Sequence, residues 1–63
     1  MVYQYENYLE LGVHTGDNIS KIVAKNIDGV DPVKRHDMVN FEMTSNEFFD
    51  RLDINKKYDI IFI

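Results

Sequence analysis

Apolar positions fall in several short runs along the chain, and the spacing within each run predicts an element of structure. Residues 8–11 form an aromatic and apolar run that stops at Gly12, which is typical of a buried strand followed by a turn. After this turn, Ile19, Ile22 and Val23 recur at intervals of three and four residues. That spacing predicts one apolar face of a short helix.

A second strand is predicted over residues 26–30. We expect it to stop at Asp31-Pro32, because proline has no amide hydrogen to donate to a strand ladder. Strand, glycine-containing turn, helix and strand together make a βαβ unit of the usual length. The two strands are therefore expected to be parallel, with a right-handed crossover.

Residues 39–43 alternate apolar and polar side chains, as a third strand does. The segment that connects them to residues 26–30 is shorter than the dozen or so residues that a parallel crossover usually needs. The pattern leaves two alternatives open. This strand joins through a tight link without a helix, or it pairs antiparallel.

A second helix is predicted to begin after Thr44. Thr44 and Glu47 have the spacing of a capping box, in which each side chain bonds the other residue's backbone amide. Phe48, Phe49 and Leu52 would form the apolar face of this helix.

The last run, from Tyr58 to Ile63, is almost continuously apolar, as strands inside parallel sheets are. The whole chain, residues 1–63, is therefore expected to be one α/β domain. It would have about four mostly parallel strands and two short helices. The strand of residues 58–63 would present an open edge, which pairs with whatever is available.

Composition narrows the possible partners and compartments. The chain has 63 residues, no cysteine and a net charge of −4. An acidic surface repels phosphate backbones, so we expect no nucleic-acid partner. No apolar run approaches the roughly 20 residues that cross a bilayer, and the start lacks a basic segment followed by an apolar one. We expect a cytoplasmic protein with no membrane partner.

The turn after the first strand has features of a ligand site. In an open α/β sheet, ligands bind at the carboxyl ends of the strands, where loops lead into helices. Gly12 would turn the chain tightly, and Gly16 would let a ligand approach the backbone. Asp31 follows Gly12 by about twenty residues, and an acidic residue there can accept hydrogen bonds from ribose hydroxyls. The dinucleotide fingerprint G-x-G-x-x-G is absent, since His14 stands at its middle glycine.

Four ordered motifs carry a family resemblance. They are Glu10-Leu11-Gly12-Val13 with Gly16-Asp17-Asn18, then Gly29-Val30-Asp31-Pro32, then residues 43–49, then residues 58–63. In this order they resemble the class I S-adenosylmethionine-dependent methyltransferases, in particular the branch that modifies small molecules and sugars. The resemblance covers nearly the whole chain. It implies the cofactor-binding half of a Rossmann-like methyltransferase fold, with strand order 3-2-1-4.

The resemblance also implies a site for S-adenosylmethionine or S-adenosylhomocysteine. Glu10 and Gly12 would lie under the methionine part of the cofactor, and Asp31 would hold the ribose hydroxyls. The turn at Thr44 and Ser45 would lie near the adenine. The full set of cofactor-binding candidates is Glu10, Gly12, Val13, His14, Gly16, Asn18, Asp31, Thr44 and Ser45.

The chain departs from the family pattern in two places. Asn46 replaces the usual acidic residue, which would weaken a hydrogen bond to the adenine amino group. The family's fourth strand continues into Asp-Gly-Leu-His, and the sequence ends at Ile63, before that motif. We expect no metal site, because His14 and His36 lie far apart in sequence with no third ligand indicated. No catalytic triad, paired acids or nucleophile pattern is present, so no catalytic residue is named.

Two functions follow as hypotheses. The first is a cofactor-binding, methyltransferase-like half-domain with little or no methyl transfer. The second is a non-enzymatic remnant or interaction module that pairs through the edge formed by residues 58–63. A homodimer in which two such edges pair antiparallel about a two-fold axis would cover the open edge in either case.

Overall fold

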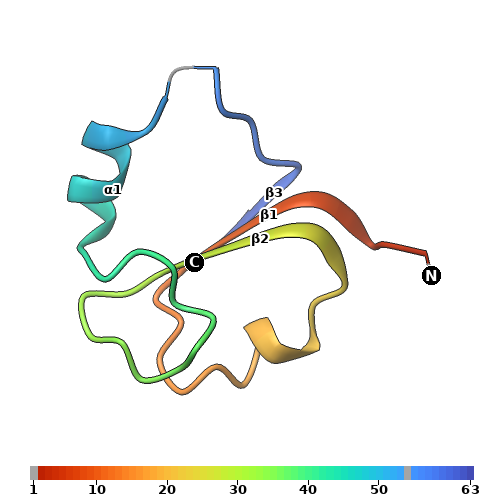
Figure 1. Cartoon of the computed structure of the whole chain (residues 1–63), viewed down its shortest axis with the longest axis horizontal. Coiled ribbons are helices and arrows are strands. Elements are labelled where there is room, and N and C mark those ends of the chain that lie inside the picture. The colour runs from red at the N-terminus through yellow and green to blue at the C-terminus, as the bar shows by residue number, and fades with distance from the viewer. Residues whose placement is uncertain (1, 54) are drawn as a thin grey trace.

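The computed structural model describes residues 2–53 and 55–63. Within these residues the chain is a small α/β fold with three strands, one α-helix and one 3-10 turn (Figure 1). The elements in chain order are β1 (Tyr5–Leu11), η1 (Ile19–Lys21), β2 (Ala24–Val30), α1 (Ser45–Arg51) and β3 (Ile60–Phe62).

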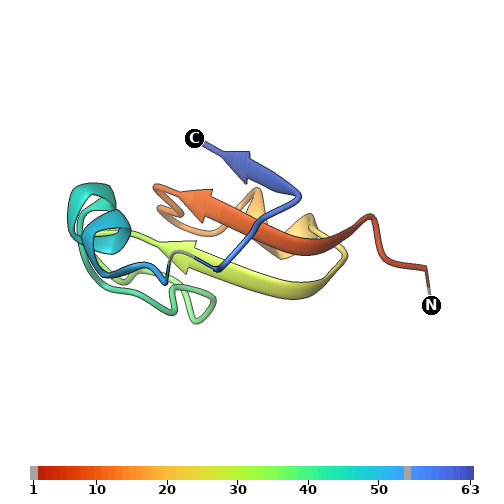
Figure 2. The same ribbon diagram turned by 90° about the horizontal axis from the view of Figure 1, so that it is seen from above.

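The sheet has the order β2-β1-β3, and both pairings are parallel. Figure 2 shows the three arrows pointing the same way, with β1 between the other two. Leu9 lies opposite Asp28 of β2 on one side and Ile61 of β3 on the other. The expected parallel pairing of the first two strands is confirmed, and β1 is longer than predicted because it begins at Tyr5.

The predicted helix around Ile19, Ile22 and Val23 is wrong. A single 3-10 turn spans Ile19–Lys21, and the chain is already extended at Ile22 (φ −80°, ψ 134°). The carbonyl of Val23 accepts the N–H of Gln4 at 2.7 Å, which draws this segment alongside the start of the sheet. Two β-branched residues in a row also disfavour a further helical turn.

The predicted third strand is wrong as well, so the described chain has three strands rather than four. Residues 39–43 make one isolated bridge, in which Phe41 pairs parallel with Val30. Beside it, the side chain of Asn40 takes the place of a backbone partner, because its Oδ1 accepts the N–H of Gly29 at 2.9 Å. The N–H of Met43 bonds the carbonyl of Phe41 at 3.0 Å, which turns the chain away from the sheet. The bridge is parallel, so the one sheet contact that residues 39–43 make with β2 is not antiparallel.

The capping box before α1 is confirmed. Thr44 Oγ1 accepts the N–H of Glu47 at 3.2 Å, and Glu47 Oε1 accepts the N–H of Thr44 at 3.3 Å. The N–H of Thr44 first, and its hydroxyl at 3.0 Å second, donate to the Glu47 carboxylate and lower the pKa of Glu47. Phe48 is buried, whereas Phe49 is 45% exposed and faces away from the sheet core.

Apolar side chains pack on both faces of the sheet. One face carries Tyr8, which packs with Val13 and Ile19 of the following segment and with Val39. The opposite face carries Leu9 and Val30, which pack against Phe48 of α1. Figure 1, in which the sheet is seen nearly edge-on, shows α1 on one side and η1 on the other. The molecule is therefore layered about the sheet.

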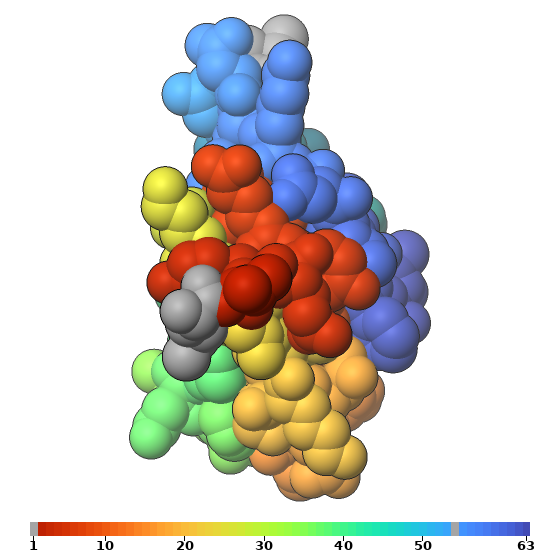
Figure 3. Space-filling model, turned by 90° about the vertical axis from the view of Figure 1, so that its right-hand side faces the viewer, coloured from red at the N-terminus to blue at the C-terminus, as the bar shows by residue number. Residues whose placement is uncertain are grey.

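The end of the chain joins the sheet through β3, which is shorter than the predicted strand of residues 58–63. Asp59 holds its start, because its Oδ2 accepts the N–H groups of Glu6 (2.6 Å) and Asn7 (3.1 Å). Among the described residues no strand lies on the outer side of β3, where Ile61 and Phe62 are 46% and 47% exposed. Figure 3 views the side where the strands begin and shows the C-terminal segment (blue) beside the N-terminal one (red). No helix in residues 2–53 and 55–63 has the length and apolar character to cross a membrane.

Candidate functional site

The bend after β1 is built on left-handed backbone conformations. Gly12 and Gly16 have φ angles of 80° and 85°, and His14 between them has a φ of 56°. Glycine adopts this region without the steric cost that a side chain brings. The N–H of Gly12 bonds the carbonyl of Val30 at 2.8 Å, which continues the β1–β2 ladder up to the bend.

Asp31 closes this bend from the neighbouring strand. Its Oδ2 accepts the N–H of His14 at 2.9 Å, and its Oδ1 accepts the N–H of Val33 at 2.9 Å. These two bonds to the carboxylate lower the pKa of Asp31, although the side chain is buried. The ends of β1 and β2 therefore meet at one edge of the sheet, the carboxyl edge.

Glu10 lies beneath the bend, in the interior. Its Oε1 accepts hydrogen bonds from the Tyr8 hydroxyl and from Asn18 Nδ2, both at 2.7 Å. Asn18 Nδ2 also lies 3.0 Å from the Tyr8 hydroxyl oxygen. Burial and the neighbouring Glu10 carboxylate raise the pKa of Tyr8. This cluster ties the far end of the bend to β1.

Two further candidates are packed against the protein itself. The Val13 side chain is buried in the core of the Tyr8 face. The imidazole of His36 covers Gly16 so closely that a Cβ at this position would overlap the ring. His36 is held in place through its Nδ1, which accepts the N–H of Met38 at 3.1 Å.

A pocket of about 500 Å³ opens at the carboxyl edge, between the strand ends and α1. Three of the nine cofactor-binding candidates line it: Gly12, Thr44 and Ser45. Its other lining residues are Leu11, Val30, Pro32, Met43, Asn46, Phe49 and Ile63. We call this space the rim pocket.

The remaining six candidates are not part of the described lining of the rim pocket. They are Glu10, Val13, His14, Gly16, Asn18 and Asp31. Glu10, Asn18 and Asp31 instead make hydrogen bonds that shape the bend, and the bend places Gly12 at the pocket. The structure thus separates the sequence candidates into a lining group and a supporting group.

The apolar wall of the rim pocket, which includes Phe49, was not predicted from the sequence. Phe49 was assigned to the core face of the helix together with Phe48. Adjacent helical residues point about 100° apart, so these two side chains cannot both face the sheet centrally. That angle is the signal that could have placed Phe49 at the site.

Nowhere in residues 2–53 and 55–63 do three or more His, Cys, Asp or Glu side chains gather as metal ligands. What the rim pocket combines is an apolar wall, the Gly12 turn and the polar residues Thr44, Ser45 and Asn46. This arrangement suits the binding of a flat, partly apolar ligand with polar edges.

No protein-family model, no curated protein and no solved structure matches this chain. The resemblance to class I methyltransferases therefore depends on the four sequence motifs alone.

Proposed function

We propose that this chain is an S-adenosylmethionine-binding, methyltransferase-like half-domain. The observation that carries the proposal is the rim pocket, which lies at the carboxyl ends of parallel strands and has Gly12 and the Thr44-Ser45 turn in its lining. Ligands of open α/β sheets bind at this edge. In the family's order 3-2-1-4, β2, β1 and β3 of this chain would correspond to strands 2, 1 and 4, and the Phe41 bridge beside β2 would correspond to strand 3. This order supports a reduced form of the family's sheet.

The size and lining of the rim pocket suit an adenosine group. Small-molecule pockets usually have volumes of about 300–1,000 Å³ and combine apolar walls with a few polar groups. Phe49 and Met43 offer apolar surface to the flat base, and Ser45 and Asn46 offer polar groups to its edge. In this arrangement Asn46 donates or accepts through its amide, where the family has a carboxylate.

Asp31 would hold the ribose hydroxyls. Each of its oxygens accepts one backbone N–H, and a carboxylate oxygen has room for a second hydrogen bond. The lowered pKa keeps the group ionised and therefore an acceptor at neutral pH. Asp31 is buried and is not in the described lining of the rim pocket, so ribose binding would require its carboxylate to become accessible from that pocket.

Methyl transfer from this cofactor depends on orientation more than on acid–base groups, because the cofactor already carries an activated methyl group. Among the described residues, the lining of the rim pocket comes from the segments 11–12, 30–32, 43–49 and 63, and no other segment is there to orient a methyl acceptor. We therefore propose binding with little or no turnover.

Calorimetric titration with S-adenosylhomocysteine and S-adenosylmethionine tests this proposal. We expect the wild type to bind, and Asp31→Ala to weaken binding about tenfold or more through loss of a charged hydrogen-bond acceptor. Asp50→Ala, which removes an exposed carboxylate of α1, is the matched control and should bind as the wild type does. Phe49→Ala removes apolar surface from the pocket without touching Asp31 and should also weaken binding. No heat from the folded wild type at millimolar ligand would reject the proposal.

A second function is favoured by the open edge of β3. Ile61 and Phe62 project to opposite faces of this edge strand and are both about half exposed, whereas apolar strands of parallel sheets are usually buried on both faces. We propose that two copies pair along this edge, antiparallel about a two-fold axis.

Light scattering coupled to size-exclusion chromatography at micromolar concentration tests the pairing. The wild type should have twice the chain mass, and Phe62→Lys should have the mass of one chain. Val33→Lys, at an exposed apolar residue outside the strands, should leave the mass unchanged. A folded wild-type monomer would contradict the pairing.

A further inference from the structure

A second pocket, of about 510 Å³, lies on the sheet face that carries α1. Its apolar wall is made by Phe41, Phe48 and Leu52, together with Met43, which it shares with the rim pocket. Phe41 and Phe48 meet edge to face, with ring centroids 5.1 Å apart. We call this space the helix-side pocket, and Met43 is the one described lining residue that it shares with the proposed cofactor site.

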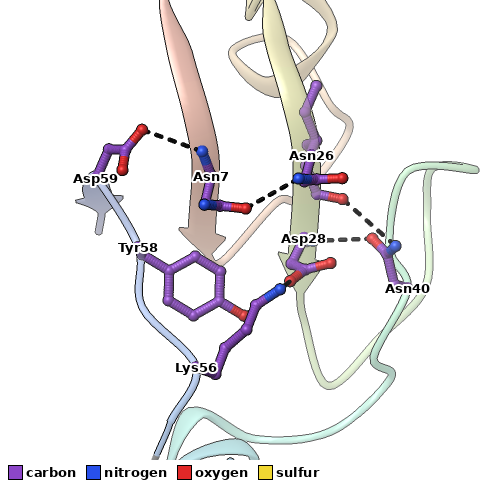
Figure 4. A network of polar contacts seen from close by, with 9 residues as sticks. Asn7, Asn26, Asp28, Asn40, Lys56, Tyr58 and Asp59 are labelled. Carbon is purple, nitrogen blue, oxygen red and sulfur yellow. Dashed lines mark hydrogen bonds and ion pairs between the residues drawn. The ribbon is translucent and has the colours of Figure 1, made fainter.

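One end of the helix-side pocket is polar and carries a carboxylate. Asp28 projects from β2, and its Oδ2 accepts the Tyr58 hydroxyl at 2.7 Å. Figure 4 shows the Tyr58 ring reaching from the segment before β3 toward Asp28. Burial and the adjacent carboxylate raise the pKa of Tyr58, so the hydroxyl stays a donor. An aromatic ring thus lies directly beside a negative charge.

The ammonium group of Lys56 occupies this position in the structure. Lys56 Nζ lies 3.8 Å from Asp28 Oδ2 and 5.3 Å from the centre of the Tyr58 ring (Figure 4). The first distance is long for a tight ion pair, and the second lies within the range of about 6 Å for a cation–π contact. The Lys56 side chain is 38% exposed, whereas that of Asp28 is 19% exposed. The lysine is therefore a loosely held cation at a more enclosed anion.

We propose that the helix-side pocket binds a small organic ammonium ion, with its ammonium group at Asp28 and Tyr58 in place of Lys56. The apolar body of the ligand would lie against Phe41, Phe48 and Leu52. A carboxylate with an aromatic face is a recurrent arrangement for ammonium recognition. The protein's own lysine marks where the charge of the ligand would sit.

The charges around the helix-side pocket favour a cation over an anion. Apart from Lys56, its charged lining residues are Asp28, Asp53 and Arg51, so displacement of the lysine leaves an excess of negative charge. An anionic ligand with the same apolar body would have to place its charge beside Asp28. The net charge of −4 on the chain acts in the same direction.

A ligand series on the wild-type protein tests the proposal without any mutation. Backbone and aromatic NMR signals would be followed during titration with 2-phenylethylammonium, 2-phenylethanol and 3-phenylpropionate. The ammonium compound should shift the signals of Phe41, Phe48 and Tyr58 in a saturable manner. The alcohol should bind at least about tenfold more weakly, since it lacks the charge-assisted bond. Equal binding of the alcohol, or no shifts at these rings, would overturn the proposal.

Two substitutions test the Asp28 carboxylate and the Lys56 ammonium group separately. Asp28→Asn keeps an acceptor for the Tyr58 hydroxyl but removes the charge, and should weaken ammonium binding about tenfold or more. Lys56→Gln removes the internal competitor and should tighten binding by about two- to fivefold, the range expected for a partly exposed ion pair.

Matched controls are Asp50→Asn and Lys57→Gln, which change exposed charges outside the helix-side pocket and should leave the affinity unchanged. Tightening by Lys57→Gln as large as that by Lys56→Gln would mean that net charge alone is responsible, and would overturn the specific site. The same variants are also titrated with the cofactor. Neither Asp28 nor Lys56 lines the rim pocket, so this titration keeps the test of the helix-side pocket distinct from the test of the rim pocket.

Discussion

The carboxylate of Asp31 accepts the backbone N–H of His14 at 2.9 Å, across the gap between the ends of β2 and β1. This bond holds a backbone in the left-handed region, at a residue that is not glycine. The same carboxylate accepts the N–H of Val33 and so also shapes the loop that follows β2. One side chain thereby organises both loops at the carboxyl edge.

We predict that Asp31→Asn destabilises the fold by about 1.5–3 kcal/mol at neutral pH, because an amide cannot accept both N–H groups as a carboxylate does. The pKa of Asp31 is lower in the folded protein than its unfolded value, near 4. Its contribution is therefore present above about pH 4 and is lost as the pH falls further. Urea denaturation across this range measures the effect.

The difference in stability between the wild type and Asp31→Asn should accordingly shrink as the pH falls below about 4. A difference that is the same at neutral and at acid pH would contradict the role assigned to the ionised carboxylate.

The two glycines of the bend should respond differently to alanine. Both have a positive φ, which costs a residue with a Cβ about 1–2 kcal/mol. A Cβ at Gly12 would have ordinary contact with His14, whereas a Cβ at Gly16 would overlap the His36 ring. We expect Gly12→Ala to cost about 1–2 kcal/mol and Gly16→Ala about 1–3 kcal/mol more, through overpacking.

The double variant Gly16→Ala with His36→Ala separates the two causes. Removing the ring should recover the overpacking part and leave the φ penalty, as measured by denaturant midpoints against His36→Ala alone. No recovery would show that the ring does not limit the space at Gly16.

The capping box should be needed for α1, which has only seven residues. Thr44→Ala removes the acceptor of the Glu47 N–H and should destabilise the protein by about 1 kcal/mol, with a loss of helical circular dichroism. Thr44→Ser keeps the hydroxyl and should be close to the wild type. Equal losses in both variants would assign the effect to the threonine methyl group instead.

The hydroxyl of Tyr8 should resist ionisation in alkali. Burial first, and the Glu10 carboxylate second, raise its pKa above the unfolded value of about 10. The stabilisation it contributes is fully present below about pH 10 and is lost as the pH rises through the folded pKa. Tyr8→Phe should therefore reduce the alkaline sensitivity of the fold, as followed by tyrosinate absorbance and circular dichroism. An unchanged alkaline transition would contradict this.

Some elements of the fold were predicted correctly from the sequence, and two were not. The capping box at Thr44 and the parallel pairing of the first two strands depend on local pattern and chain length, and both were predicted. The helix around Ile22 failed because a hydrogen bond from Gln4, distant in sequence, draws Val23 into line with the sheet. The third strand failed because the Asn40 side chain replaced a backbone partner at Gly29. Neither contact leaves a signal in the periodicity.

In the candidate site, too, some features could be predicted from the sequence and others could not. The residues at the bend and at the ends of the strands could be named from their types and spacing, since glycine and aspartate have local conformational preferences. Which of them line the rim pocket could not be read from spacing. Asp31 turned toward the His14 amide, and His36 covered Gly16, both through contacts between separate loops.

By itself, the sequence determined where β1, β2, β3 and the capped helix α1 form, because backbone preferences and the alternation of apolar side chains act over a few neighbouring residues. Only the tertiary structure decided how many strands the described residues contribute to the sheet, and which polar groups are used up by the protein itself. The physical reason is that hydrogen-bond partners and packing neighbours are chosen across the fold, where segments far apart in the chain compete for the same backbone groups.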